Sequence, residues 1–318
     1  MYKTISELYK DNPFPGKLIK YLDAKKSFIS IVFLYLARLT LFGKQNSLRL
    51  RNFYLKGLGH EPKLIIDIGC GTGETTHILG KAFPKSQIIG IDICTNSINY
   101  AKKLNRYLKL TNVTFTNKDI NNFDTLNFIN NSDIIILSGS LHHFKNPKKI
   151  LRFLYSKIKK KGYLIFGVYG RMFENERYFS DLFQKLDFIN SSTDIMNIVK
   201  SLNIDRGKIV LNMKRENRFF RLIKSLFFFD LSYIGYVLFP HNIDAINLDG
   251  YANPIVHYYN PNNLSELINE IKEKKIEYVL PKTNYDNNIY YKKMNNYEKF
   301  LFCDANSIIS SYTLKLWN

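Results

Sequence analysis

The sequence predicts an α/β fold: N-terminal helices, a doubly wound and mostly parallel sheet of seven strands, and an inserted helical cap. From Lys63 onward, short β-branched runs alternate with helical stretches. These runs are almost continuously apolar, as the strands of a parallel sheet are when helices cover both faces. A chain of 318 residues that is 45% hydrophobic and 23% charged is also large enough to bury such a core.

The elements of this fold can be read in chain order. Residues 1–60 are predicted to be helical and basic, with a break at 11–16, where two prolines and a glycine cannot continue a helix. Five apolar strands are then predicted, at 64–69, 87–92, 112–117, 132–137 and 162–168. Helices are predicted between strands at 74–83, 97–108 and 147–159.

The alternation stops after residue 170, and the stretch that follows is longer, more polar and more helical. It resumes with a predicted helix at 261–274 and predicted strands at 276–280 and 308–316. Four regions follow from this pattern. They are an N-terminal helical segment (1–60), a ligand-binding core (61–170), an inserted cap that contributes to an acceptor site (171–260), and the C-terminal part of the core (261–318).

The three cysteines, Cys70, Cys94 and Cys303, are far apart and form no CxxC pair. A disulfide framework and a zinc ribbon are therefore excluded as organising principles, and a reducing, cytoplasmic location is expected. The first residues include Glu7 and Asp11 and contain no apolar run, so no signal peptide is expected.

The net charge of +19 has two explanations that stay open. One is an acidic partner, such as an anionic membrane surface. The other is a low-GC genome, because the charge is mostly lysine and the chain is also rich in Asn, Ile, Phe and Tyr. The most apolar windows, 28–42 and 219–240, are short or interrupted by charges, so neither is expected to span a membrane. Each suits a buried helix or a face for a lipid or apolar substrate, which leaves peripheral membrane contact open.

A glycine loop is predicted where the first strand becomes a helix. Gly69, Gly71 and Gly73 follow the spacing G-x-G-x-G, and Asp67 stands two residues before the first glycine. A dinucleotide fingerprint has the spacing G-x-G-x-x-G and holds a pyrophosphate, which the Asp67 carboxylate would repel. Such a carboxylate instead suits a cation, such as the ammonium of S-adenosylmethionine.

Asp92 ends the second strand, 19 residues after Gly73. An acidic residue at about this distance is placed to bind a ribose diol, since a carboxylate accepts hydrogen bonds from two hydroxyls. The cofactor predicted from these residues is S-adenosylmethionine.

With these residues in place, the sequence resembles the class I S-adenosylmethionine-dependent methyltransferases. The motifs that carry the resemblance are IIDIGCGTG (65–73), IIGIDIC (88–94), KDI (118–120), LSGSLHHF (137–144) followed by Asn146-Pro147, and KKGYLIFGVYG (160–170). The resemblance implies a Rossmann-like fold and a transferase activity. The sequence also resembles, more loosely, a subgroup that contains bacterial protein-lysine methyltransferases. The segments that carry this second resemblance are YxxNPFP (9–15), GVYG (167–170) and YANPIVHYY (251–259).

The candidate site residues fall into three groups. The residues expected to bind the cofactor are Asp67, Gly69, Cys70, Gly71, Gly73, Asp92, Ile93, Asp119, Ile120 and Ser138. His142 and His143 are candidate catalytic residues, because imidazole can accept a proton near neutral pH. The residues expected to bind the acceptor are Tyr169, His257, Tyr258 and Tyr259.

Other functions are disfavoured by missing motifs. The sequence contains neither the Asn/Asp-Pro-Pro-aromatic motif of base N-methylation nor a Pro-Cys nucleophile, so nucleic acid is not the expected partner. No carboxylate–histidine cluster suggests a metal. Three hypotheses remain: methylation of a small or lipid-like acceptor, methylation of a protein lysine, and cofactor binding without catalysis.

Overall fold

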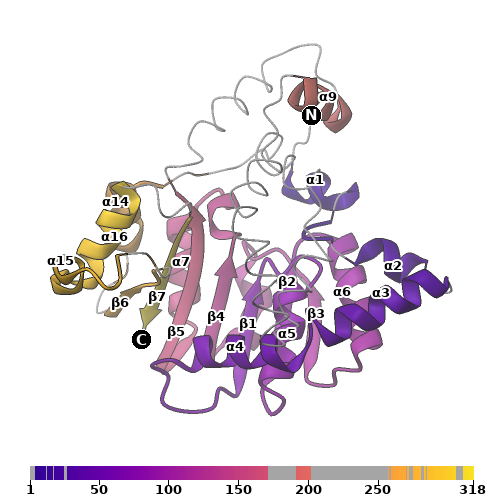
Figure 1. The fold of residues 1–318 in the computed structure, drawn as a ribbon, viewed down its shortest axis with the longest axis horizontal. Helices are drawn as coiled ribbons and strands as arrows, with labels where there is room; N and C mark the ends of the chain where they lie inside the picture. The colour runs from indigo at the N-terminus through magenta and orange to yellow at the C-terminus, as the bar shows by residue number, and fades with distance from the viewer. Residues whose placement is uncertain are drawn as a thin grey trace.

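The computed structural model describes residues 4–11, 13–16, 18–24, 27–170, 191–201, 257, 259–269, 271, 275–280, 283, 285–305 and 311–318. Their strands form one seven-stranded sheet with the order β3-β2-β1-β4-β5-β7-β6 (Figure 1). The strands are β1 (Leu64–Ile68), β2 (Gln87–Asp92), β3 (Val113–Asn117), β4 (Ser132–Ser138), β5 (Ile158–Tyr169), β6 (Lys275–Tyr278) and β7 (Ser311–Trp317). β1 to β5 pair in parallel, and β7 is antiparallel to both of its neighbours. The predicted fold class is confirmed.

The α-helices of the described residues are α1 (Ile5–Asp11), α2 (Ile19–Asp23), α3 (Phe28–Leu39), α4 (Lys44–Leu55), α5 (Glu74–Ala82), α6 (Thr95–Leu108), α7 (Pro147–Tyr155), α9 (Ser192–Ser201), α14 (Pro261–Asn269), α15 (Ile289–Lys293) and α16 (Asn296–Ala305). Two 3-10 helices, η1 (Phe123–Ile129) and η2 (Leu141–His143), flank β4.

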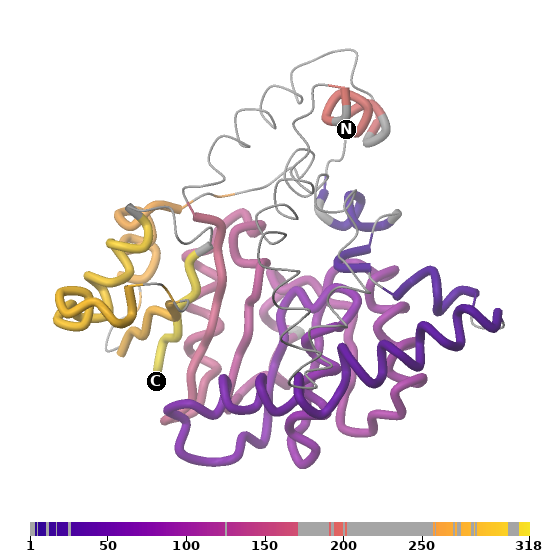
Figure 2. The backbone as a smooth tube through the Cα atoms, in the orientation of Figure 1, coloured from indigo at the N-terminus to yellow at the C-terminus, as the bar shows by residue number. Residues whose placement is uncertain are grey.

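Side-chain alternation along the strands divides the core into two layers. Ile65 packs on the side of α4, α5 and α6, whereas Ile66 packs on the side of α7, α14 and α16. Both residues are fully buried, as expected for a strand covered on both faces. Figure 2 shows α2 and α3 at one end of the sheet and the C-terminal helices α14, α15 and α16 at the other.

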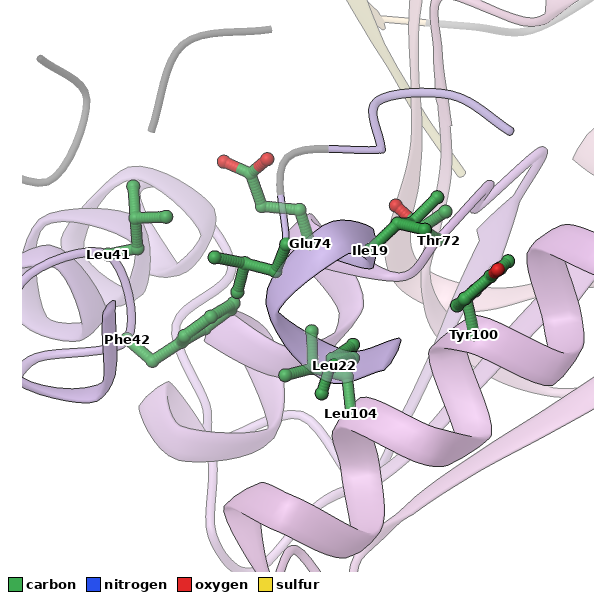
Figure 3. A pocket seen from close by; sticks show the side chains of 9 residues that line it. Ile19, Leu22, Leu41, Phe42, Thr72, Glu74, Tyr100 and Leu104 are labelled. Atoms are coloured by element: carbon green, nitrogen blue, oxygen red, sulfur yellow. The ribbon is translucent and has the colours of Figure 1, made fainter. Parts of the chain in front are cut away.

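The N-terminal helices pack on the outer side of α5 and α6. Leu22 of α2 and Leu34 of α3 join a cluster with Ile78 and Leu104. A cavity of about 20 Å³ lies at this junction. Figure 3 shows the side chains that line it, among them Leu22 and Leu104. A space of this size holds about one water molecule, so it is a packing defect and not a ligand site.

Three elements, α7, α15 and α16, differ from the predictions. The helix predicted to end at Lys159 ends at Tyr155, because Ile158 pairs with Ser132 and Lys159 forms an ion pair with the buried Asp133. Helices α15 and α16 were not predicted. The region boundaries stay predictions, and most of the predicted cap, including the apolar window at 219–240, lies outside the described residues.

Within the described part of the chain, the stretch Phe28–Leu55 has the length and apolar composition of a membrane-crossing helix. It consists of α3 and α4, which are separated at Thr40–Gly43. One side of α3 packs on the protein through Leu34 and Ala37. These contacts favour a helix that packs on the protein by one side over a span surrounded by lipid.

Candidate functional site

A cavity of about 340 Å³ lies at the carboxyl ends of β1, β2, β3 and β4. β1 lies between β2 and β4, so the strand order runs from β1 toward β3 on one side and from β4 onward on the other. Open α/β sheets bind ligands at such switch points in strand order. The volume lies in the range of small-ligand sites. The lining includes Tyr9, Phe14, Ile68, Gly69, Gly71, Ile91, Asp92, Ile93, Ser97, Lys118, Asp119, Ile120, Asn121, Gly139, Ser140, His143, Phe144 and Lys145.

The three loop glycines all have positive φ angles, of 70° at Gly69, 53° at Gly71 and 80° at Gly73. Each also meets a different neighbour. An added Cβ would lie 2.5 Å from Cβ of Ser140 at Gly69, 2.2 Å from the Phe14 carbonyl oxygen at Gly71, and 2.7 Å from the Phe115 ring at Gly73. Gly69 and Gly71 line the cavity, whereas Gly73 is a site of close packing between helix and sheet.

Asp92 lies at the cavity wall and is held by two backbone donors. The Gly71 N–H donates to one carboxylate oxygen and the Cys94 N–H to the other, both at 2.8 Å. Burial raises the pKa of Asp92, and the two backbone donors oppose this effect. Each oxygen has further lone pairs, so a fixed carboxylate can also accept hydrogen bonds from a ligand diol.

The predicted adenine-binding residues lie beside Asp92. Ile93 and Ile120 give the cavity two apolar surfaces. Asp119 is exposed at its edge, and its Oδ1 accepts from both the backbone N–H and the side-chain amide of Asn121, each at 2.8 Å. An apolar slot with a carboxylate at its rim can hold a flat ring that carries an amine.

Ser97, in the first turn of α6, also lines the cavity, and sequence reasoning did not select it. Its hydroxyl oxygen is buried and has no hydrogen-bond partner among the described residues. A buried hydroxyl without a partner is costly. A polar ligand in this cavity would supply one.

Besides Gly73, three other predicted cofactor contacts do not line this cavity. Asp67 is buried beneath the loop, where the Thr76 hydroxyl donates to it at 2.6 Å. The Cys70 thiol is buried against Gly90, where an added Cβ would lie 2.9 Å from its sulfur. Ser138 is exposed, and the next two residues, Gly139 and Ser140, line the cavity instead. Direct ligand contact by these three residues and by Gly73 stays a prediction that this geometry does not favour.

Asp67 and the neighbouring His77 give the stability two opposing pH dependences. Burial raises the pKa of Asp67 to about 7, above its ordinary 3.8, so its contribution is lost as the pH rises from about 4 to 7. Burial lowers the pKa of His77 to about 4, below its ordinary 6.5, so its contribution is lost as the pH falls from about 6.5 to 4.

We expect the two substitutions Asp67→Asn and His77→Gln to shift the pH dependence of unfolding in opposite directions. Asp67→Asn should make stability rise more steeply between pH values of about 4 and 7, and His77→Gln should make it fall, each by roughly 2–3 kcal/mol across this range. Urea unfolding of both variants and the wild type at several pH values measures the slopes. Equal slopes in all three would contradict the buried positions of the two groups.

The candidate acceptor residues come together beside the cavity. The His142 ring centroid lies 4.0 Å from that of His143 and 4.0 Å from that of Tyr169. The His257 N–H donates to the His142 carbonyl at 2.9 Å, which brings the distant 257–259 segment to η2. Of this set, His143 lines the cavity.

Tyr259 is a core residue. Its N–H donates to the Tyr169 carbonyl at 3.0 Å, and its side chain is buried in the same layer as Leu264, where burial raises the pKa of its phenol. It therefore anchors the segment and does not face the cavity. Tyr258 lies outside the described residues.

Sequence reasoning missed the N-terminal strap, residues 4–16, whose Thr4, Ser6, Tyr9 and Phe14 line the cavity. The strap is tied down along its length. Thr72 N–H donates to the Phe14 carbonyl at 2.9 Å, and the Asn96 amide donates to the Lys10 carbonyl at 2.6 Å. The YxxNPFP segment was the available signal. It was used for the subgroup resemblance and not for the site.

No group of three His, Cys, Asp or Glu side chains that could hold a metal ion occurs in the part of the chain that the structure describes.

Comparison with known proteins identifies a methyltransferase domain over residues 60–221, about half of the chain. The malonyl-[acyl-carrier protein] O-methyltransferase of Bacillus cereus is 33% identical over 106 residues, which are 33% of this chain and 37% of that protein. The enzyme of the same name from Priestia megaterium is 32% identical over 133 residues, which are 41% of this chain and 46% of that protein. The matches thus span less than half the length of these curated relatives.

The solved structure of PKMT2 from Rickettsia typhi shares the fold, with a TM-score of 0.53 and 17% identity. The likeness covers 87% of this chain and 53% of that one. The protein-lysine subgroup resemblance stays a prediction, because a likeness at this identity concerns the fold alone. The family prediction is confirmed, since the matched domain contains the glycine loop and the strand ends that line the cavity: this chain belongs to the class I S-adenosylmethionine-dependent methyltransferases.

Proposed function

We propose that this protein transfers a methyl group from S-adenosylmethionine to a small or lipid-like acceptor. The observation that carries the proposal is the cavity at the ends of β1 to β4, where Gly69, Gly71 and Asp92 meet within the matched methyltransferase domain. The Ser97 hydroxyl, which has no hydrogen-bond partner among the described residues, supports a polar ligand in this cavity.

We also propose a cytoplasmic location. The three cysteines, Cys70, Cys94 and Cys303, are buried free thiols, which supports a reducing compartment.

The residues fit the proposed cofactor by charge and shape. Asp92 would accept hydrogen bonds from the ribose hydroxyls, and Ile93 and Ile120 would enclose the adenine, with Asp119 at its amine. Gly69 and Gly71 would leave room at the methionine end. Asp67 would act from beneath the loop, where its pKa of about 7 allows it to ionise near a cation.

When bound, the cofactor supplies an activated methyl group on a sulfonium. This chain's residues then orient the acceptor nucleophile in line with that methyl group and exclude water, since positioning provides most of the rate in such reactions. The His143 ring and Phe144 lie at the cavity wall, and Tyr169 stands behind His142, so these residues would shape the acceptor side. His143 would take the acceptor proton if the acceptor is a hydroxyl or an ammonium.

The class of acceptor is supported by charge and by the relatives. The curated relatives are named for O-methylation of malonyl-[acyl-carrier protein]. A malonyl group ends in a carboxylate, which needs no base to become a nucleophile. Lys118 and Lys145 both line the cavity and could hold such an anion.

Methyl-labelled S-adenosylmethionine, incubated with purified protein and a fractionated cell extract, tests this proposal. We expect label in the low-mass or organic fraction with the wild type and none with Asp92→Ala. Label in protein bands would instead indicate the protein-lysine alternative. A labelled acyl group on a carrier protein would also appear in protein bands, so that label must first be shown to resist chemical release of acyl groups. Tight cofactor binding without any transfer would indicate the non-catalytic alternative.

A further inference from the structure

Helix α3 is apolar on both of its faces, although the protein covers only one. Leu34 and Ala37 are buried in a cluster with Leu22 of α2 and Leu104 of α6. The opposite side, here called the outer face of α3, consists of Phe28, Ile29, Ile31, Val32, Tyr35 and Leu39, all of which are exposed. Phe28 is 79% exposed and Ile29 is 64% exposed. A surface helix ordinarily carries polar residues on its outer side, so this face is suited to an apolar environment.

The sequence around this face is entirely free of acidic residues. Between Asp23 and Glu61 there is no Asp or Glu. The same stretch carries seven cations, which are Lys25, Lys26, Arg38, Lys44, Arg49, Arg51 and Lys56. Arg38 and Lys44 are exposed at the C-terminal end of α3, and the Lys25-Lys26 pair precedes its N-terminal end in the sequence. Among the described residues, the cations Arg38 and Lys44 thus lie beside the apolar face, and an apolar helix face with adjacent cations is typical of helices that lie in a membrane interface.

An open basic hollow of about 820 Å³ continues from the end of α3. Lys44, Arg51, Lys81 and Lys85 line it together with Phe42 and Leu48, and Glu61 is its one acidic lining residue. The Lys81 ammonium donates to the Phe42 carbonyl at 2.6 Å, which holds the cation at the hollow. The Arg51 guanidinium is paired through two hydrogen bonds with Glu61, so Lys44, Lys81 and Lys85 are the cations that face a ligand here. A hollow with three lysines and apolar walls suits a phosphate group attached to an apolar chain.

We propose that the outer face of α3 and this basic hollow dock the protein on an anionic phospholipid surface. The apolar side chains would enter the boundary between headgroups and acyl chains, and the Lys and Arg side chains would contact lipid phosphates. The inner face of α3 stays packed on α2 and α6, so the helix lies on the membrane and does not cross it. A second copy of this surface is a poorer partner, because cations without acids would repel each other across a symmetric interface.

Sedimentation of the full-length protein with vesicles tests the proposal. We expect binding to phosphatidylcholine vesicles that contain phosphatidylserine, little binding to phosphatidylcholine alone, and weaker binding at high salt. The double variant Phe28→Ser/Ile29→Ser should lower vesicle affinity at least about tenfold. Arg38→Glu/Lys44→Glu should lower it by a similar factor on anionic vesicles.

Helix α15 provides matched controls, since it lies at the opposite end of the sheet from α3 (Figure 1). Ile289 and Tyr290 are 63% and 72% exposed, and these fractions are similar to those of Phe28 and Ile29. The variants Ile289→Ser/Tyr290→Ser and Lys292→Glu/Lys293→Glu make the same chemical changes there and should keep wild-type vesicle binding. Thermal unfolding midpoints within the wild-type range would show that all four variants are folded.

Several outcomes would overturn the proposal. One is the absence of binding to anionic vesicles, and another is an equal loss in the α3 and α15 variants. Self-association in ultracentrifugation that disappears in Phe28→Ser/Ile29→Ser, without vesicle binding, would assign the face to a second copy. Vesicle binding that resists both high salt and alkaline carbonate would indicate a membrane span.

Discussion

Replacing Asp92 with alanine is expected to weaken S-adenosylmethionine binding by about a hundredfold or more. Two hydrogen bonds from ribose hydroxyls to a carboxylate are worth roughly 3 kcal/mol together, and this energy corresponds to about a 150-fold change in Kd. The substitution also leaves the N–H groups of Gly71 and Cys94 without the acceptor that fixes the loop. Calorimetric titration with the cofactor measures the loss.

The matched control is Asp119→Ala, at the exposed rim of the same cavity. Its carboxylate accepts only from Asn121 in this structure, so its removal should cost roughly tenfold or less. Thermal unfolding of both variants without cofactor separates binding from folding. An Asp92→Ala protein that is folded and binds the cofactor as the wild type does would contradict the assignment of this cavity.

The substitution Gly71→Ala is expected to detach the N-terminal strap and to raise the cofactor Kd by at least about tenfold. Its Cβ would lie 2.2 Å from the Phe14 carbonyl oxygen, and that oxygen accepts the Thr72 N–H, so the strap and the loop cannot both keep their positions. Release of the strap removes Tyr9 and Phe14 from the cavity wall. Limited proteolysis near the N-terminus, together with calorimetric titration, reports both effects.

Gly59 and Gly139 separate this clash from simple backbone strain. Both have positive φ angles, of 72° and 75°, and an added Cβ would meet nothing within 4 Å at either. Gly59→Ala should therefore cost only the strain of roughly 1 kcal/mol, away from the site, and Gly139→Ala should add strain at the cavity without moving the strap. If all three variants behave alike, the contact between strap and loop has no special importance.

The core of the fold could be predicted from the sequence because its signals are local. The strands β1 to β5 contain short runs rich in apolar residues, and the pattern of 65–73 places a loop between a strand and a helix. Ile93, Asp92 and Asp119 follow strand ends, so they were found from their positions alone. Parallel pairing then brings those ends to one edge of the sheet without further information.

The strap, Ser97 and the position of Asp67 could not be predicted in the same way, because each depends on contacts between distant segments. Tyr9 reaches the cavity because α1 packs on α6, about ninety residues later in the chain. Asp67 carries the right charge for a cationic ligand, yet strand alternation turns it toward Thr76 and α5. The exposure of the outer face of α3 was likewise hidden, since its composition equals that of a buried helix.

The position of β7 bears on how the chain is completed during synthesis. β7 lies between β5 and β6 and pairs with both, so residues 311–317 fill the interior of the sheet from the late part of the chain. While the chain is still growing on the ribosome, β5 has one unpaired edge of seven apolar-rich residues, Tyr163–Tyr169. Exposed edges of this kind pair with other chains. The nascent protein is thus prone to aggregate until β7 emerges and covers this edge, and a chaperone that shields β5 would act in that interval.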